Sequence, residues 1–472
     1  MLVKSAGREN LTYLPHLMAL LLEQLCANHP VLETRLTSVR ESQTLVAMVW
    51  AAWLLGLAIA TIVLEQELAV RAQRPTQWPA CSKCGTRLHS KGMRPRQLMT
   101  LVGIVHWKRR VGRCPQGCQG VQVAPLDAAL GVSADQQTSV ELVQLGCLLA
   151  VFVPFHTVTV LLQRLTGVQL SPGTIWNWVQ LVGHQAMGQL QQEIQQLTDG
   201  VYPAAEPISH QVARMPLVLG ADGVMVPLRP YQGQPHGKPQ WREVKVAILV
   251  RLGRRFTRKG KDICQLHQRR LVAVLGDIEA LRPRLLLEAL RQGLHSAEHI
   301  VWLSDGGRGF WGLYQDCFAH CAIGILDFYH AAQNLWKAAA AALDGRTTKA
   351  HQWFRLVRHQ LRHGEAESVI AQLALAINFR SFPTNVHNTL RHVHDYLETH
   401  RDHIKYDHFK ALGLPLGSGM VESACKWLIQ QRFKGVGMRW SEDGFNHLLH
   451  LRLAWVNGRF DNLFPSRASP NR

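Results

Sequence analysis

The sequence predicts a multidomain protein of mixed α/β class, and three observations lead to this prediction. The chain has 472 residues, of which 47% are hydrophobic, enough for about three domains that each bury a core. Four of its cysteines fall into two close pairs, which is typical of a small metal-binding module. Beyond residue 214, apolar runs of strand length come first and helices then alternate with strands, which favours a mixed α/β domain.

The chain is strongly basic. Its 52 lysines and arginines outnumber its 33 aspartates and glutamates, so the formal net charge is +19. This excess indicates a polyanionic partner, either nucleic acid or an anionic membrane surface. The ten cysteines are too dispersed for a disulfide scaffold, and the first ten residues lack the apolar core of a secretory signal. We therefore expect a cytoplasmic protein.

One apolar segment allows a different location. Residues Thr44–Leu64 contain no charged side chain and are long enough for a helix to cross a bilayer. The alternative is a helix buried in the fold or covered at a dimer or interdomain interface, because acidic and basic residues flank the segment closely and no other segment resembles a membrane span. We expect this second interpretation, and hence no membrane association.

Residues 1–76 are predicted to be helical, and residues 77–126 are predicted to form a zinc ribbon. Cys81 and Cys84 form one pair, and Cys114 and Cys118 form the other, so each pair places two thiolates on a tight turn. Four thiolates suit tetrahedral Zn²⁺, and the intervening residues alternate as β-strands do. The ion would be structural, because four cysteines leave no position for water. The alternative is two unrelated pairs of reduced cysteines.

The second strand of this ribbon is rich in basic side chains. Four of them are placed to contact DNA phosphates, namely Lys108, Arg109, Arg110 and Arg113.

After a linker at residues 125–127, the region 135–200 is predicted to form a helix-turn-helix. Gly167 marks the turn, Ser171 suits the N-cap of the second helix and Pro172 suits its first position. The exposed face of that helix, which would enter a major groove, carries Thr174, Asn177 and Gln180. The alternative is an ordinary helical hairpin in which Trp176 and Trp178 only pack.

A second linker at residues 199–207 leads to a domain predicted over residues 214–465. Its elements are expected to be a β-hairpin over 215–228, a third strand over 242–253, a helix over 279–294, a strand that ends at Asp305 and a strand and helix over 321–343.

Three acids in this domain are candidates for catalysis. Asp222 and Asp305 each end an apolar strand and precede a glycine, whereas Glu422 lies in a helix that Ser418 can cap, on the face that also carries Lys426 and Gln430. Three converging carboxylates form an oxygen site that Mg²⁺ or Mn²⁺ prefers. Two such ions ~4 Å apart would activate a water or a 3′ hydroxyl and stabilise the leaving oxygen of a phosphodiester. Taken singly, each acid is also typical of a turn or a solvated helix.

The motifs around these acids resemble those of a known family. They are ADGVMVPLR with WREVKVAILV behind it, LSDGG, LDFYHAAQNL, and LPLGSGMVESACKWLIQQRFKGVGMRWS followed by LRLAWVNGRFD. Together with the cysteine ribbon, they resemble bacterial insertion-sequence transposases of the DDE class, in the Kra-type group. The resemblance covers most of residues 81–461.

The resemblance implies a catalytic triad of Asp222, Asp305 and Glu422 in an RNase H-like domain, with a helical insertion at about residues 335–410. The chain departs mildly from the family at Gly306-Gly307, because a small residue such as alanine would be expected after the first glycine.

Other polar residues near the triad are further candidates. Asp327 and His330 follow a strand and would flank the metal site or orient DNA; the alternative is a structural role. A basic stretch that includes one aromatic residue follows Glu422 and consists of Lys426, Arg432, Lys434, Arg439 and Trp440. These residues would contact phosphates and stack on a base. The alternative is a solvated helix face with a core tryptophan.

The function expected from the sequence is that of a bacterial transposase. The ribbon and the helix-turn-helix would bind terminal inverted repeats, and the triad would cleave the strand and join it to target DNA as at least a homodimer. One alternative is a metal-dependent nuclease that cuts without joining. Another is a catalytically silent DNA-binding regulator derived from such an enzyme.

Overall fold

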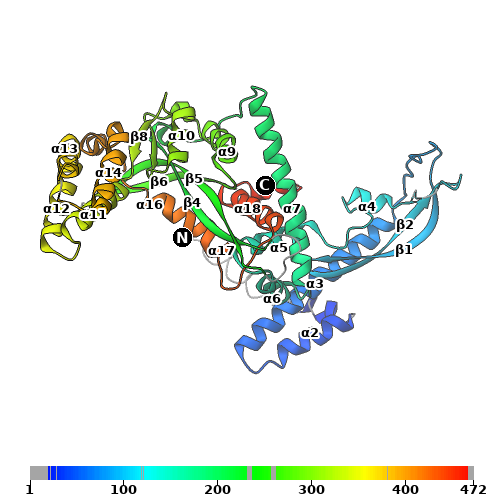
Figure 1. Cartoon of the computed structure of the whole chain (residues 1–472). Coiled ribbons are helices and arrows are strands. Elements are labelled where there is room, and N and C mark those ends of the chain that lie inside the picture. Colours follow the sequence, from blue (N-terminus) through cyan, green and yellow to red (C-terminus); the bar gives the residue numbers. More distant parts are fainter. Residues whose placement is uncertain are drawn as a thin grey trace, which may run out of the picture. The chain divides into compact units, whose positions relative to one another are not determined.

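A computed structural model describes residues 20–21, 23–27, 29–118, 120, 122–230, 237–256, 262–379 and 381–465 (Figure 1). The chain divides into two compact units, Met1–Trp178 and Val179–Arg472. Each unit combines one β-sheet with helices, which confirms the mixed α/β class. Residues 1–19 of the predicted N-terminal helical region lie outside the described residues.

The first unit begins with two helices, α2 (Pro30–Arg40) and α3 (Leu45–Gln73). The hydroxyl of Thr44 accepts a hydrogen bond from the Ala47 N–H and caps α3. Leu32 of α2 and Leu55 of α3 are buried together with Cys26, so the two helices share a small apolar core. Among the described residues, α3 is the one helix that is long and apolar enough to cross a membrane.

A three-stranded antiparallel sheet follows, formed by β1 (His89–Thr100), β2 (Gly103–Arg113) and β3 (Gln122–Val123). The strands expected between the two cysteine pairs are therefore confirmed. Leu68 of α3 packs against Val105 and Trp107 of β2 in a second core. The linker expected at residues 125–127 is instead the start of a short helix, α4 (Pro125–Ala129), because Pro125 suits a first helical position.

The helices predicted for the helix-turn-helix are present as α5 (Val140–Phe152), α6 (Phe155–Thr166) and α7 (Pro172–Thr198). Gly167 ends α6 with a left-handed φ of 73°. The Ser171 hydroxyl accepts a hydrogen bond from the Thr174 N–H at 3.1 Å, as expected for an N-cap. The ring of Trp178 lies against Gly146, and Trp176 contacts Phe155 edge to face, so both tryptophans are packing residues.

The sheet of the second unit has the strand order β6-β5-β4-β7-β8. Its strands are β4 (Leu217–Leu228), β5 (Gln240–Phe256), β6 (Asp262–Leu275), β7 (Ile300–Ser304) and β8 (Ile323–Leu326). The first three strands pair antiparallel, whereas β4 with β7 and β7 with β8 pair parallel. The central strands are buried on both faces, so this sheet forms the core of the unit.

The remaining described helices surround this sheet or extend from it (Figure 1). The α-helices are α8 (His210–Arg214), α9 (Ile278–Arg291), α10 (Arg308–Cys317), α11 (Phe328–Leu343), α12 (Thr348–Arg362), α13 (Ala366–Ile377), α14 (Thr384–Thr399), α15 (Tyr406–Ala411), α16 (Gly419–Ala424), α17 (Gln431–Phe433) and α18 (Glu442–Val456). Short 3₁₀ turns are η1 (Leu294–Ser296), η2 (Arg401–His403) and η4 (Phe460–Leu463), and η3 (Cys425–Gln430) is a π-helix.

The prediction of a hairpin over residues 215–228 is wrong. These residues form the single strand β4, which pairs with β5 at every position from Leu217 to Leu228. Asp222-Gly223 was expected to be the turn, but the continuous partner strand β5 keeps it extended. Asp222 therefore lies in the middle of a strand.

The segment predicted as the second linker is anchored by one glutamate. The Glu206 carboxylate accepts hydrogen bonds from Arg270 (2.7 Å), Gln292 (2.9 Å) and Arg459 (3.0 Å to Nε). Burial alone would raise the pKa of this carboxyl, but the hydrogen bonds and charge of Arg459, with those of Gln292 and Arg270, hold it below its ordinary value. Arg459 also pairs with the buried Glu288.

Glu206→Gln is expected to lower the free energy of unfolding by about 3 kcal/mol at pH 7, because it leaves Arg459 and Arg270 partly buried with less counter-charge. The lowered pKa stabilises the fold above the ordinary glutamate pKa of about 4.3, so the difference from wild type should disappear as the pH falls through the folded value. Urea unfolding at several pH values measures it. Glu279→Gln, at a largely exposed ion pair with Arg282, should cost less than about 1 kcal/mol. Equal costs would show that the Glu206 cluster is not stabilising.

Candidate functional site

The two cysteine pairs come together at one point of the first unit. The sulfur atoms of Cys81, Cys84, Cys114 and Cys118 all lie within 4.8 Å of one another. Gly85, directly after Cys84, and Gly117, directly before Cys118, have positive φ angles of 72°, which the tight turns at the two pairs require. Within the described parts of the chain, no other group of three or more His, Cys, Asp or Glu residues brings its ligand atoms so close. Four thiolates in this arrangement could hold a tetrahedral Zn²⁺.

The basic side chains of β2 differ in their exposure and in their hydrogen bonds. Lys108 and Arg113 are exposed and Arg110 is half-buried. Arg109, in contrast, donates through Nε to the buried Asp127 at 3.0 Å and through Nη1 to two backbone carbonyls of β1. Its guanidinium therefore joins β2 to α4 and β1, which is a different use from the expected phosphate contact.

On α7, Asn177 is exposed and Thr174 is half-buried with its hydroxyl 3.0 Å from that of Ser171. Gln180 was expected on the same exposed face. Its side-chain oxygen instead lies 2.7 Å from Nδ1 of His447 in α18, so Gln180 makes a side-chain contact within the second unit. Of the three polar residues, Asn177 keeps the exposure that a groove contact needs.

Two of the three candidate acids occupy neighbouring positions near the centre of the large sheet, Asp222 within β4 and Asp305 directly after the end of β7. Parallel pairing of β4 with β7 aligns Ala221 with Ser304, so Asp222 and Asp305 are the next residues in register. Residues aligned in this way point to the same face of a sheet. Both side chains are half-buried. Gly307 N–H donates to Oδ1 of Asp305 at 3.1 Å and orients its carboxylate.

The third acid, Glu422, is exposed on α16, which packs on β4 and β5 (Figure 1). A methyl group on Gly220 would lie 2.5 Å from Cγ2 of Val421, so the missing side chain lets α16 contact the sheet two residues before Asp222. Side chains two residues apart share a face of a strand. The helix that carries Glu422 therefore covers the face to which Asp222 points.

The pKa of Asp222 depends on the other two candidate acids. Burial raises the pKa of its carboxyl, the Gly223 N–H lowers it, and the nearby carboxylates of Asp305 and Glu422 raise it again. Burial together with the charges of Asp222 and Glu422 raises the pKa of the Cys425 thiol to about 12. The three carboxylates form a looser group than the four thiolates, and a bound cation would offset their mutual repulsion.

Asp327 is a structural residue, and His330 lies near the acids. The Asp327 carboxylate is almost fully buried and accepts hydrogen bonds from the N–H groups of Tyr329, His330 and Ser418. Ser418 occupies the N-cap position of α16, but its side chain makes no cap hydrogen bond. His330 is half-buried and lies close enough to Asp222 for its charge to lower the pKa of that carboxyl.

The basic stretch after Glu422 divides into exposed and buried residues. Lys426, Lys434 and Arg439 are exposed. Arg432 and Trp440 are buried and stack on one another, with 5.2 Å between the guanidinium carbon and the ring centre, so neither meets the expectation of DNA contact and base stacking. Glu422, Lys426 and Gln430 are all exposed, with buried residues between them, which agrees with the expected shared face although the segment Cys425–Gln430 is a π-helix.

Tyr396 of α14 is a neighbour of the site that sequence reasoning missed. A methyl group on Gly306 would lie 2.0 Å from Cε2 of Tyr396, so only glycine fits after Asp305. Burial, followed by the charges of Asp305 and Asp327, raises the pKa of the Tyr396 hydroxyl. Gly306 is therefore a packing requirement, and this glycine was the signal that the sequence offered for a close neighbour.

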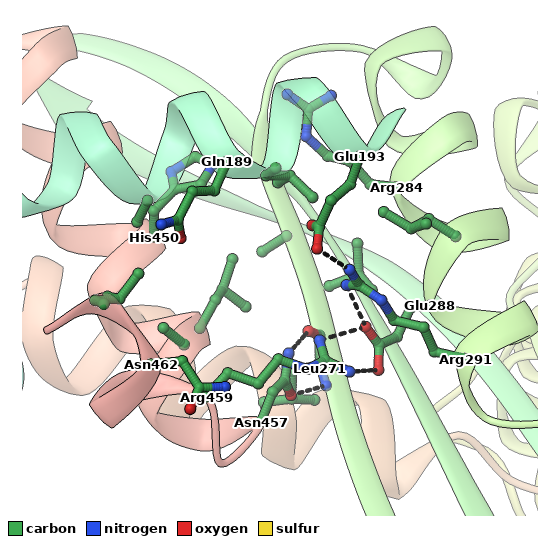
Figure 2. Close-up of a pocket in the computed structure, with 18 residues that line it drawn as sticks. Gln189, Glu193, Leu271, Arg284, Glu288, Arg291, His450, Asn457, Arg459 and Asn462 are labelled. Carbon is green, nitrogen blue, oxygen red and sulfur yellow. Dashed lines mark hydrogen bonds and ion pairs between the residues drawn. The ribbon is translucent and has the colours of Figure 1, made fainter. Parts of the chain in front are cut away.

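A cavity of about 200 Å³ lies elsewhere in the second unit, between β6, α7, α9 and α18. Figure 2 shows its charged side chains facing one another, and Arg291 pairs with Glu193 while Arg459 pairs with Glu288. None of the three candidate acids lines it.

No protein-family model matches the chain, and no curated protein matches its sequence. One solved structure to which the chain is similar is the Drosophila P element transposase strand transfer complex. The sequences are 11% identical, and the similarity covers 69% of this chain and 80% of that chain with a TM-score of 0.25. This score is too low to establish a shared fold.

The cysteine cluster predicts one bound zinc ion per chain. Cys84→Ser or Cys118→Ser should reduce the zinc content strongly, because three thiolates hold the ion less tightly than four. Metal analysis of the purified protein by mass spectrometry measures this. Cys264→Ser, at an exposed cysteine of β6 outside the cluster, should keep the full content. Full zinc retention in Cys84→Ser would exclude the cluster as the metal site.

Gly306→Ala is expected to lower the free energy of unfolding by about 2 kcal/mol, because the Tyr396 ring must move. Gly312→Ala, in α10 with open space around it, should be neutral or slightly stabilising. In a Tyr396→Ala background, Gly306→Ala should cost little, and the double-mutant cycle gives the coupling energy. Additive costs would contradict a direct contact between the two residues.

Proposed function

We propose that this protein is a DDE transposase that binds the terminal inverted repeats of an insertion sequence and catalyses metal-dependent strand cleavage and strand transfer. The observation that carries the proposal is that Asp222 and Asp305 directly follow the last aligned pair of the parallel strands β4 and β7, beneath the helix that bears Glu422. The five-stranded sheet, antiparallel in its first three strands and parallel in its last two, supports an RNase H-like catalytic domain over residues 214–465. The helices α12–α15 would then belong to an insertion at about residues 335–410.

Asp222, Asp305 and Glu422 would hold Mg²⁺ or Mn²⁺, and the donor set fits because carboxylate oxygens are the ligands that these ions prefer. Two bound ions would supply an activated water or 3′ hydroxyl and neutralise charge at the phosphodiester. The protein's own residues hold the carboxylates in place. Gly307 orients Asp305, and Asp327 fixes the backbone at the start of α16. His330 is a second-rank candidate for contact with the DNA or the acids.

DNA binding would use the exposed basic and polar residues of both units. In the ribbon at residues 77–126 these are Lys108, Arg113 and the half-buried Arg110, and in the helix-turn-helix at residues 135–200 they are Asn177 and the partly accessible Thr174. Near Glu422 they are Lys426, Lys434 and Arg439. Lys434 lies over the exposed ring of Trp241, a surface on which a base could stack. The net charge of +19 agrees with this function, which the protein would carry out in a bacterial cytoplasm.

The proposal predicts that Asp222→Asn, Asp305→Asn and Glu422→Gln each lower strand cleavage by about 1,000-fold or more, which corresponds to about 4 kcal/mol of lost transition-state stabilisation. Binding of the repeat duplex should change little. The assay uses a duplex with the terminal repeats of the element, in Mg²⁺ or Mn²⁺, and follows both nicked and joined products. Glu279→Gln, which changes a carboxylate on α9 outside the candidate triad, is the matched control.

Three results would contradict the proposal in different ways. A triad variant that keeps full cleavage removes that residue from the site. Cleavage without any joined product favours the nuclease. Binding without cleavage in the wild-type protein favours the silent regulator.

A further inference from the structure

The N-terminal half of α3 leaves an apolar surface uncovered. Five large side chains there are between 48% and 74% exposed. Their spacing along the helix places them on one broad stripe. We call this stripe the α3 face, and it consists of Leu45, Val46, Val49, Trp50 and Trp53. The indole N–H of Trp53 donates to the Leu165 carbonyl at 3.2 Å, so its polar group is satisfied while its ring stays exposed.

The second half of α3 is fixed to the rest of the first unit. The hydroxyl of Thr61 donates to the Val102 carbonyl at 2.7 Å, and the Glu65 carboxylate accepts from the His106 N–H at 2.7 Å. Leu68 is buried against β1 and β2. The α3 face therefore belongs to a helix that the fold holds in place.

This anchoring argues against a membrane as the occupant of the face. Residues 45–60 precede the first hydrogen bond of α3 to the β1–β2 hairpin, which Thr61 makes, and at 1.5 Å per residue they extend about 24 Å. The hydrocarbon core of a bilayer is about 30 Å thick. The rest of α3 would have to leave its hydrogen bonds with β2 before it could face lipid.

The composition and size of the face suit another protein surface. It carries no charge, so it does not attract DNA, and its two tryptophans are typical of interface cores. Its exposed side chains offer on the order of 600 Å² per copy, close to the ~800 Å² that each partner buries in a standard stable dimer.

We propose that the α3 face is a dimerisation surface on which a second copy of this chain packs its own α3 face. One helix face can serve both partners, because a two-fold axis pairs a surface with itself. The inference rests on the proposed function in one respect: an enzyme that joins two DNA ends needs two catalytic units. The pairing itself requires neither DNA nor an active triad.

The test measures the mass of the full-length protein over a range of concentrations by analytical ultracentrifugation, without DNA. Wild type should be a dimer at micromolar concentration. Val49→Glu should raise the dimer dissociation constant by more than about 100-fold, because dimerisation would bury an unpaired charge. Glutamate is a good helix former and position 49 is exposed, so the fold should persist, which circular dichroism and zinc content check. The matched control is Leu375→Glu, at an exposed leucine of α13, and it should remain a dimer.

A wild-type protein that stays monomeric up to 50-fold above about 1 μM overturns the inference, as does a Val49→Glu variant that dimerises like wild type. A monomer that floats with neutral phosphatidylcholine vesicles also overturns it and assigns the face to lipid. The same measurements distinguish this inference from the proposed function. A dimer that never cleaves repeat DNA would contradict only the proposed transposase function. A monomer that cleaves and joins DNA would contradict only the proposed dimerisation.

Discussion

The candidate site depends on the parallel pairing of β4 with β7. The two strands come from segments about 80 residues apart, and the alignment of Ala221 with Ser304 makes Asp222 and Asp305 neighbours on one face. The strand β7 ends at Ser304, whereas β4 continues beyond Asp222 beside β5. Asp222 is therefore held rigidly from one side and open on the other. This combination of a fixed backbone and an accessible carboxylate is what a metal-binding acid needs, and a flexible turn at Asp222 would not supply it.

Part of the large positive charge of the chain acts inside the protein. Arg251 is fully buried in β5 and donates to four backbone carbonyls and one hydroxyl, so it ties the sheet to the segments around α8 and η1. Arg452 donates to the carbonyls of Trp427 and Leu428 and secures the segment after Glu422. Burial lowers the pKa of both guanidinium groups. Because such arginines act inside the protein, net charge overstates the charge available to phosphates.

Local patterns in the sequence predicted local features of the structure. Glycine, serine and proline at residues 167–172 marked the turn and the start of α7, and cysteine spacing predicted the cluster of thiolates. Features that depend on distant residues were missed. Asp222-Gly223 has the composition of a turn, yet a partner strand keeps it extended. The sequence likewise did not predict the partners of Arg109 and Trp440, because these partners lie on segments that are distant along the chain or outside any regular spacing.

One buried carboxylate links the two halves of the candidate site. The Asp327 N–H donates to the Ser304 carbonyl at 2.9 Å, directly before Asp305, while its carboxylate accepts from the N–H of Ser418, four residues before Glu422. The same side chain caps α11. The end of β7, the start of α11 and the start of α16 are thus fixed by the hydrogen bonds of a single residue. Buried, fully satisfied polar groups of this kind are rigid, because each lost hydrogen bond would leave an unpaired group away from water. The position of Glu422 relative to Asp305 is therefore set by Asp327, a residue whose carboxylate oxygens are already committed to backbone N–H groups.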